Sequence, residues 1–206
     1  MTSMSPDPVA TASVDWRSDL PQLLGLSVTL REPVLQDVGP LVDLLSTAYA
    51  TRFGLDGPLS QIAVSGLIER CADDRKAGLA FTYAIAMTSS RAVVGLIQVR
   101  QLDPAFETAE WECTLAPSSR GSGIFLDAAR LVASFVFGSV GAHRLEARVL
   151  LQNGRANGAL RKLRAVQEGI LRQSVRCGSE YADQVLWSLL KEDWSDHWVS
   201  TEARVH

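Results

Sequence analysis

The stretch APSSRGSGIFLDAARLVASFVF, residues 116–137, places a glycine-containing loop directly before a long apolar segment. From Ile124 onward the segment is apolar on most faces of a helix, which indicates a helix buried against a sheet. Two interpretations of the preceding Arg120-Gly121-Ser122-Gly123 are open. It is either a turn that lets the helix pack closely on a strand, or a loop that holds an anion at the helix N-terminus.

The anion interpretation rests on the backbone. The first N–H groups of a helix have no partner within it and lie at the positive end of its dipole. Gly121 and Gly123 would let a phosphate approach these groups because they lack side chains, and Arg120 adds a positive charge. The loop is not a Walker loop, because no Gly-Lys-Ser/Thr follows, and it lacks the third glycine of a dinucleotide fingerprint. Alone, the four residues fit a packing turn equally well.

Composition limits the classes of protein. The chain has 206 residues, of which 47% are hydrophobic and 21% charged, as in an ordinary globular domain. Its net charge of -3 gives no basic excess for binding a nucleic-acid backbone. No signal-peptide pattern is visible, and no stretch reaches the roughly 20 apolar residues of a membrane span. We therefore expect a cytoplasmic protein that binds neither nucleic acid nor membrane.

Cysteines and histidines form no metal or disulfide pattern. The three cysteines, Cys71, Cys113 and Cys177, are scattered, and so are the three histidines. These spacings argue against a disulfide framework and a zinc site, so we expect reduced thiols and no metal. Because no histidine lies at a suggestive spacing from Cys113, we expect this residue to be a small buried side chain and not a nucleophile.

Hydrophobic periodicity predicts alternating strands and helices. Strands are expected at 27–31, 81–87, 92–102, 108–115, 143–151, 168–175 and 181–190. Helices are expected at 41–49, with Asp37 as the cap, and at 60–77, 124–140 and 157–163. In the strand 143–151, Leu145, Ala147 and Val149 alternate with Arg144, Glu146 and Arg148, so the two sets should face opposite sides of the sheet.

This order predicts an α/β fold with a mixed central sheet of about seven strands and helices on both faces. Helix-bearing connections flank the strand 143–151, which indicates parallel pairing in the middle of the sheet. Residues 1–26 are rich in Ser, Thr, Pro and Asp and are expected to form a flexible arm. We assign 27–195 to one domain and 196–206 to a tail. An exposed last strand would offer a homodimer contact.

The order of these segments resembles the GNAT superfamily of N-acetyltransferases, and within it the ribosomal-protein alanine and serine acetyltransferases. The likeness covers about 27–194. The segments that carry it are AEWECTLAPSSRGSGI (109–124), AHRLEARVLLQN (142–153), NGRANGALRKL (153–163), EGILR (168–172) and DQVLWSLLKEDW (183–194). Residues 109–124 are similar to the family's fourth strand with its diphosphate loop, and residues 142–153 are similar to its fifth strand, which ends in an asparagine.

The resemblance implies that acetyl-CoA binds along the strand 108–115 as a co-substrate. The amides of Gly121, Ser122, Gly123, Ile124 and Phe125, with Arg120, would hold its diphosphate. Backbone groups of Thr114 and Leu115 would pair with the pantetheine arm like an added strand. Asn153 would hydrogen-bond the arm, and Asn157 and Arg161 would line its outer side.

Departures from the family's pattern occur at Phe125 and Leu160, and also at Ala156 and Arg164-Ala165. Phe125 replaces the small last residue of the loop, so we expect its ring to turn away from the cofactor. Leu160 stands where many relatives carry a tyrosine that protonates the leaving thiolate, which leaves the catalytic acid unassigned; Tyr181 is an alternative, although a place at the sheet edge is the simpler role for it. By the same resemblance, Tyr49, Arg52 and Phe53 are candidates for contact with the acceptor.

Glu110 and Glu112 are the candidate catalytic residues. They flank Trp111 and share one face of the strand by its period of two, and a carboxylate there would take a proton from the ammonium group of the acceptor, directly or through water. The structural alternative for either residue is a solvated face or an ion pair with Arg100 or Arg148. Trp111 fits a core position as well as the border of the acceptor pocket.

The leading functional hypothesis is an N-acetyltransferase that moves an acetyl group from acetyl-CoA to a primary amine by direct attack in a ternary complex. The acceptor is a peptide N-terminus or a small amine. The alternative is a non-catalytic acyl-CoA-binding or interaction module on the same fold. A nucleotide-binding protein of another kind is the weakest hypothesis, because the Walker lysine and an acidic ribose partner are not found in the sequence.

Overall fold

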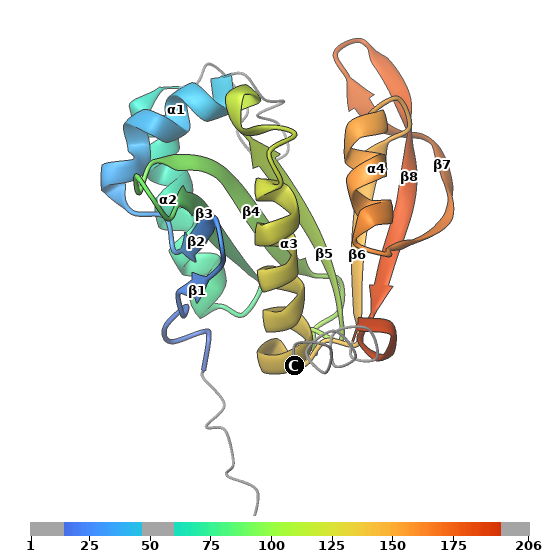
Figure 1. Cartoon of the computed structure of the whole chain (residues 1–206), viewed down its shortest axis with the longest axis horizontal. Helices are drawn as coiled ribbons and strands as arrows, with labels where there is room; N and C mark the ends of the chain where they lie inside the picture. Colours follow the sequence, from blue (N-terminus) through green and yellow to red (C-terminus); the bar gives the residue numbers. More distant parts are fainter. Residues whose placement is uncertain (1–14, 47–59, 195–206) are drawn as a thin grey trace, which may run out of the picture.

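The computed structural model describes residues 15–46 and 60–194, which form a mixed sheet with helices on both faces (Figure 1). The strands are β1 (Leu23–Leu24), β2 (Val28–Arg31), β3 (Ala80–Met87), β4 (Val93–Gln101), β5 (Thr108–Leu115), β6 (Arg144–Leu150), β7 (Val166–Cys177) and β8 (Glu180–Leu190). The helices are α1 (Val38–Ser46), α2 (Gln61–Lys76), α3 (Ile124–Phe135) and α4 (Gly154–Lys162). The strand order in the sheet is β1-β2-β3-β4-β5-β6-β8-β7.

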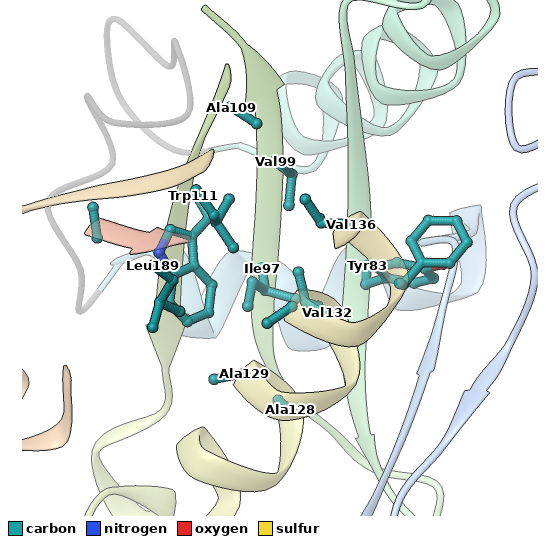
Figure 2. Close-up of a cluster of buried hydrophobic side chains, with 14 of the residues drawn as sticks. Tyr83, Ile97, Val99, Ala109, Trp111, Ala128, Ala129, Val132, Val136 and Leu189 are labelled. Atoms are coloured by element: carbon teal, nitrogen blue, oxygen red, sulfur yellow. The ribbon is translucent and has the colours of Figure 1, made fainter. Parts of the chain in front are cut away.

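Each face of the sheet has its own hydrophobic cluster. Helices α1 and α2 pack on one face, where Leu41 and Val64 meet Ala84 and Leu96. Helix α3 packs on the other face, where its apolar side, including Val132, lies over the middle strands (Figure 2). Residues of β4 that face α3, such as Ile97, alternate with residues that face α1, as the pleat of a strand requires.

The predicted parallel pairing in the middle of the sheet is confirmed. Strand β5 pairs parallel with β6, whereas the other neighbouring strands are antiparallel. The chain connects β5 to β6 through α3, because parallel strands need a crossover. The last strand, β8, lies between β6 and β7. The exposed edge is therefore β7, and not the last strand as the sequence analysis expected.

The N-terminal boundary predicted at residue 26 is wrong, and the sheet has eight strands instead of about seven. Strand β1 pairs antiparallel with β2, and Trp16 and Leu20 are buried in the core. The buried Tyr83 hydroxyl donates a hydrogen bond to the carbonyl of Pro21 at 2.9 Å. Residues 15–26 therefore belong to the domain, and the remainder of the expected arm, 1–14, lies outside the described residues.

Three helices differ from their predicted bounds. A 3₁₀ turn, Leu35–Asp37, precedes α1, so Asp37 ends this turn instead of capping the helix. Helix α3 begins at Ile124 as predicted, but Val136–Val140 widens into a π turn. Helix α4 begins at Gly154 because Asn153 caps it, accepting from the amide of Ala156.

Helix α2 follows the sequence prediction closely. Ser60 accepts a hydrogen bond from the amide of Ala63 at its start, and Gly78, with a φ of +74°, follows its end. The predicted continuation of the first helix to Tyr49 lies outside the described residues. So do the proposed acceptor contacts Tyr49, Arg52 and Phe53 and the predicted tail, 196–206.

Candidate active site

The site is organised by a split between β5 and β6. Their pairing is confined to Thr108–Glu110 and Arg144–Glu146, although β5 continues to Leu115 and β6 to Leu150. Figure 1 shows the two strands diverging beyond this point. Strand β6 therefore leaves the edge of β5 beyond Glu110 uncovered, and a ligand that runs along β5 can pair with its backbone groups.

One pocket lies where the split opens toward α3 and α4, and we call it the α4-side pocket. Its lining comes from β5, β6 and the two helices: Trp111, Glu112, Cys113, Phe125, Ala147, Arg148, Val149, Asn153, Ala156 and Leu160. Most of these side chains are apolar or uncharged. The pocket suits a ligand segment that is itself largely uncharged.

A second pocket, the charged pocket, lies on the opposite face of the sheet. Its lining residues are Gln98, Arg100, Glu110, Trp111, Glu112, Arg148, Val175 and Gln184. Trp111, Glu112 and Arg148 line both pockets, so the pockets meet at the split between β5 and β6. Two molecules that enter from opposite faces can react there.

The loop before α3 presents a run of backbone amides. Gly121 and Gly123 have φ angles of +87° and +89°, a conformation that glycine adopts readily. The hydrogen bonds of the helix begin with the amide of Asp127, which donates to the carbonyl of Gly123 at 3.1 Å. Within the described residues, the amides of Gly121 to Leu126 have no protein acceptor. These donors and the helix dipole are available to an anion.

Arg120 ties the loop to the end of β5. Its Nε donates to the carbonyl of Leu115 at 3.0 Å, and the hydroxyl of Ser122 donates to the carbonyl of Ser119 at 2.8 Å. Arg120, Gly121, Ser122 and Gly123 thus lie together at the N-terminus of α3, as the sequence predicted. The carbonyl of Leu115, predicted to pair with the cofactor arm, already accepts one hydrogen bond.

Asp127 has a structural role that the sequence did not reveal. Its carboxylate accepts hydrogen bonds from the amides of Ser27 at 2.7 Å and Val28 at 3.3 Å. These bonds fasten the first turn of α3 to the start of β2. A Cβ at Gly25 would lie 2.9 Å from this carboxylate and from the Leu131 side chain, so a larger residue there would displace them.

The two candidate glutamates have different environments. Glu110 is 9% exposed and forms ion pairs with Arg100 and with Arg148, the latter at 3.4 Å. The ion pair that the sequence left open as an alternative is therefore present at Glu110. Both carboxylate oxygens of Glu110 are thus in contact with guanidinium groups. Glu112 is partly exposed and lines both pockets, whereas Glu110 lines only the charged pocket.

Asn157, predicted to line the outer side of the cofactor, is buried in the structure and bonded to other parts of the chain. Asn157 is 4% exposed. Its Nδ2 donates to the carbonyl of Leu150 at 3.0 Å, and its Oδ1 accepts from the indole N–H of Trp187 at 2.9 Å. Asn157 thereby fixes α4 to β6 and β8. Arg161 is exposed, with its guanidinium carbon 5.3 Å from the centroid of the Trp187 ring, and Asn153 lines the α4-side pocket.

The ring of Phe125, which we expected to turn away from the cofactor, lies against Trp111 at the α4-side pocket. The ring stacks on Trp111 with centroids 5.9 Å apart and planes inclined by 29°, and both residues line the α4-side pocket. Trp111 is 4% exposed and belongs to the core as well as to both pockets. The stacked pair narrows the pocket near the split.

No tyrosine occupies the place predicted for a catalytic acid. Leu160 is 2% exposed and lines the α4-side pocket. Tyr181 is 63% exposed and is not among the residues that line either pocket. Burial, together with nearby Glu112, raises the pKa of the Cys113 thiol to about 12, so Cys113 stays protonated near neutral pH and is not a nucleophile.

Comparison with known families agrees with this geometry. The profile described as "Acetyltransferase (GNAT) domain" matches residues 27–166. The chain belongs to the GNAT acetyltransferase family. It is 24% identical over 169 residues to the uncharacterized N-acetyltransferase p20 of Bacillus licheniformis, covering 82% of this chain and 95% of the relative. The protein is therefore an acyltransferase.

Solved structures show the same fold. Mycobacterium smegmatis RimJ, in complex with CoA-disulfide, has a TM-score of 0.76 at 18% identity and covers 91% of this chain and 96% of its own. The ribosomal-protein-S5-alanine acetyltransferase of Vibrio fischeri has a TM-score of 0.73 at 16% identity, with coverage of 84% and 98%. At these identities the likeness concerns the fold.

The GNAT family uses acetyl-CoA, and the residues present here fit that molecule. The unpartnered amides before α3 suit a diphosphate, the open edge of β5 suits an amide-containing arm, and the α4-side pocket connects the two.

Within residues 15–46 and 60–194, no cluster of histidine, cysteine or acidic side chains is arranged to hold a metal ion. No helix in these ranges has the length and apolar character needed to cross a membrane.

Sequence reasoning missed Arg148 as a residue of the site. It was named only as an ion-pair partner of a glutamate, yet it lines both pockets. Its place depends on the parallel register, which only the structure supplies: Glu110 pairs with Glu146, so the next residues on that face of β5 and β6 are Glu112 and Arg148.

Proposed function

We propose that this protein transfers an acetyl group from acetyl-CoA to a primary amine by direct attack within a ternary complex. The observation that supports the proposal best is the meeting of the α4-side pocket and the charged pocket at Trp111, Glu112 and Arg148. In this arrangement the thioester reaches the split from one face of the sheet and the amine reaches it from the other. Neither molecule has to leave before the other arrives.

The residues around the α4-side pocket would bind acetyl-CoA. The amides of Gly121–Phe125 and the Nη groups of Arg120 would hold the diphosphate. Backbone groups near Thr114 and Leu115 would pair with the pantetheine arm, and Asn153, whose Oδ1 caps α4, would use its Nδ2 for the same arm. Bound acetyl-CoA supplies an activated acyl group, and the chain positions it.

Glu112 would act as the base. A free α-amino group has a pKa of about 7.7–8.0, so a nearby carboxylate or a water bound to it is enough to take its proton. The charged pocket provides further carboxylate and amide oxygens, such as those of Gln98 and Gln184, that would bind an ammonium group. The acceptor we propose is a peptide N-terminus or a small amine, and the ribosomal-protein acetyltransferases among the structural neighbours make peptides the first acceptors to test.

The test is release of the coenzyme A thiol during incubation of acetyl-CoA with a panel of N-terminal peptides, amino acids and polyamines. A ternary complex gives intersecting double-reciprocal lines when both substrates are varied. Parallel lines would show that an acyl-enzyme forms instead. If no amine in the panel releases thiol while acetyl-CoA binds, the transferase proposal is wrong.

One observation favours the alternative of a non-catalytic acyl-CoA-binding module: buried Leu160 offers no proton donor in the α4-side pocket. In that case calorimetry would show acetyl-CoA binding without turnover. Binding would also be unchanged by Glu112→Gln, because that residue would have no chemical role.

Location and assembly are further proposals. Cys71, Cys113 and Cys177 are free thiols, which suits a reducing compartment such as the cytoplasm. The edge strand β7 exposes Val166 and Ile170, and we propose it as the contact of a homodimer. Sedimentation of the full chain at several concentrations tests this contact, since Ile170→Lys should keep a β7-mediated dimer monomeric.

A further inference from the structure

Arg148 lies where the two pockets meet. The last parallel pair of β5 and β6 is Glu110 with Glu146, and the side chains two residues further on lie on the same face of each strand. These side chains are Glu112 and Arg148, which face each other across the first part of the split. Both line the α4-side pocket and the charged pocket.

The guanidinium group of Arg148 is only partly satisfied by protein groups. Its Nη1 lies 3.4 Å from a carboxylate oxygen of Glu110, and its Nη2 lies 3.6 Å from one of Glu146. Its Nε is enclosed and has no hydrogen-bond partner, and it is the only buried side-chain polar atom in this state within the described parts of the chain. A buried donor without an acceptor is costly, so a ligand acceptor in the split would relieve this cost.

Each of the two carboxylates beside Arg148 also contacts a second arginine. Glu110 also pairs with Arg100, and Glu146 also accepts a hydrogen bond from Arg144 at 2.8 Å. The contacts of Arg148 to these carboxylates, at 3.4 and 3.6 Å, are longer than those of Arg144 to Glu146 and Glu168, at 2.8 and 2.6 Å.

The α4-side pocket offers few other groups that can stabilise negative charge. Among the residues that line it, Arg148 is the only cation. Leu160 is apolar, and the Nδ2 of Asn153 is a neutral donor that the proposed function gives to the pantetheine arm. The thiol of Cys113 is a weak donor. A thioester sulfur that reaches the split thus has one positively charged partner within the lining.

We propose that Arg148 stabilises the thiolate of coenzyme A as it leaves, in place of a proton-donating side chain. The inference rests on the proposed acetyl transfer. The amine nitrogen attacks the thioester carbonyl carbon, a C–N bond forms, the C–S bond breaks, and sulfur keeps the electron pair. Glu112 or its water takes the ammonium proton and passes it to solvent or to the departing thiolate, while Arg148 holds the negative sulfur in between.

The experiment uses the binary complex with coenzyme A, so that no acceptor has to be known. The thiolate of the bound coenzyme is titrated by its ultraviolet absorbance, with the desulfo-coenzyme A complex subtracted to remove the cysteines of the protein. In the wild type the bound thiol should titrate about one pH unit or more below free coenzyme A. Arg148→Met should return the midpoint to the free value, and Arg148→Lys should keep part of the shift.

Arg100→Met is the matched control, because it also removes a partner of Glu110 but lines only the charged pocket. It should leave the thiol midpoint as in the wild type. An unshifted midpoint in the wild type, or an equal loss of the shift in Arg100→Met and Arg148→Met, overturns the role of Arg148. The wild-type titration decides the matter even if Arg148→Met does not fold. Failure of coenzyme A to bind at all would overturn the proposed function itself.

Discussion

The ring of Phe125 stacks on Trp111 with its centroid 5.9 Å away, so the first turn of α3 contacts β5 at the point where the two pockets meet. A small residue here would leave that part of the α4-side pocket open. The aromatic pair therefore sets the width of the α4-side pocket next to the split.

Phe125→Ala should widen the pocket and relax selectivity for the acyl chain. One methylene in a pocket is worth about 10- to 200-fold in selectivity, so the rate with propionyl-CoA relative to acetyl-CoA should rise by about tenfold. The loss of the stacked ring should also destabilise the fold by about 1–3 kcal/mol. Steady-state rates with the two donors and urea unfolding measure both effects.

Phe125→Leu is the control for the acyl-chain experiment, because it keeps most of the side-chain volume. It should retain the preference of the wild type for acetyl-CoA. An unchanged ratio in Phe125→Ala would show that the ring does not border the acyl group.

Replacement of each glutamate by glutamine separates a catalytic role from a structural one. Glu112→Gln should lower kcat by about 10²-fold and leave the dissociation constant of coenzyme A within about twofold, because only a proton acceptor is lost. Glu110→Gln should act mainly on stability, by about 1–2 kcal/mol, because Arg100 and Arg148 would lose the charge they share. Steady-state kinetics and urea unfolding of both variants measure these effects. A loss of kcat in Glu110→Gln and a loss of stability alone in Glu112→Gln would make Glu110 the base.

The strand and the loop that carry the site could be predicted from the sequence. Strand β5 has the predicted bounds Thr108–Leu115, because Asp103-Pro104 ends the preceding strand and the segment alternates. Helix α3 begins at the predicted Ile124, because the glycines at 121 and 123 interrupt regular structure before it. These features depend on neighbours along the chain, which a sequence displays directly.

The contacts within the site could not be predicted in this way. Arg148 and Glu110 are 38 residues apart, and Trp187 and Asn157 are 30 apart, so their meeting depends on which strands become neighbours and in what register. The burial of Asn157 and the stacking of Phe125 on Trp111 follow from packing between elements. For the same reason residues 15–26, which have no clear periodicity, resemble a free arm in the sequence, although Trp16 fills a place beside Phe81 in the core.

Gly123 is predicted to serve both the fold and the diphosphate site. With its φ of +89°, an alanine there should cost about 1–2 kcal/mol of stability, and its methyl group would stand beside amides that are free to bind an anion. We expect Gly123→Ala to weaken binding of coenzyme A by about tenfold or more, since several charge-assisted hydrogen bonds depend on that geometry. Calorimetry measures the binding.

Gly138→Ala is the matched control for the glycine experiment. Gly138 lies in the π turn after α3, and an added Cβ would meet no atom within 4 Å. This variant should bind coenzyme A like the wild type and should be no less stable. Equal effects of the two substitutions would mean that the loop before α3 does not hold the cofactor.

Asp37 should make stability depend on pH in the acid range. Burial by itself would raise the pKa of this carboxyl group. Hydrogen bonds from Arg31 at 2.7 Å and from the amide of Val34 at 2.9 Å outweigh burial, and the pKa is lowered below its ordinary value of 3.8. A carboxyl group with a lowered folded pKa stabilises the fold above its unfolded pKa, and this contribution is lost as the pH falls through the folded value.

Asp37→Asn should therefore destabilise the protein by about 3 kcal/mol at pH 7, and the difference from the wild type should shrink as the pH is lowered below about 4. Urea unfolding at a series of pH values measures it. Asp73→Asn is the control, because Asp73 is exposed and lies 3.8 Å from Lys76, and such surface pairs contribute about 0–1 kcal/mol. A difference that stays constant, or grows, toward acid pH would contradict the ion pair with Arg31 as the source of the stability, because protonation of Asp37 removes that pair from the wild type as well.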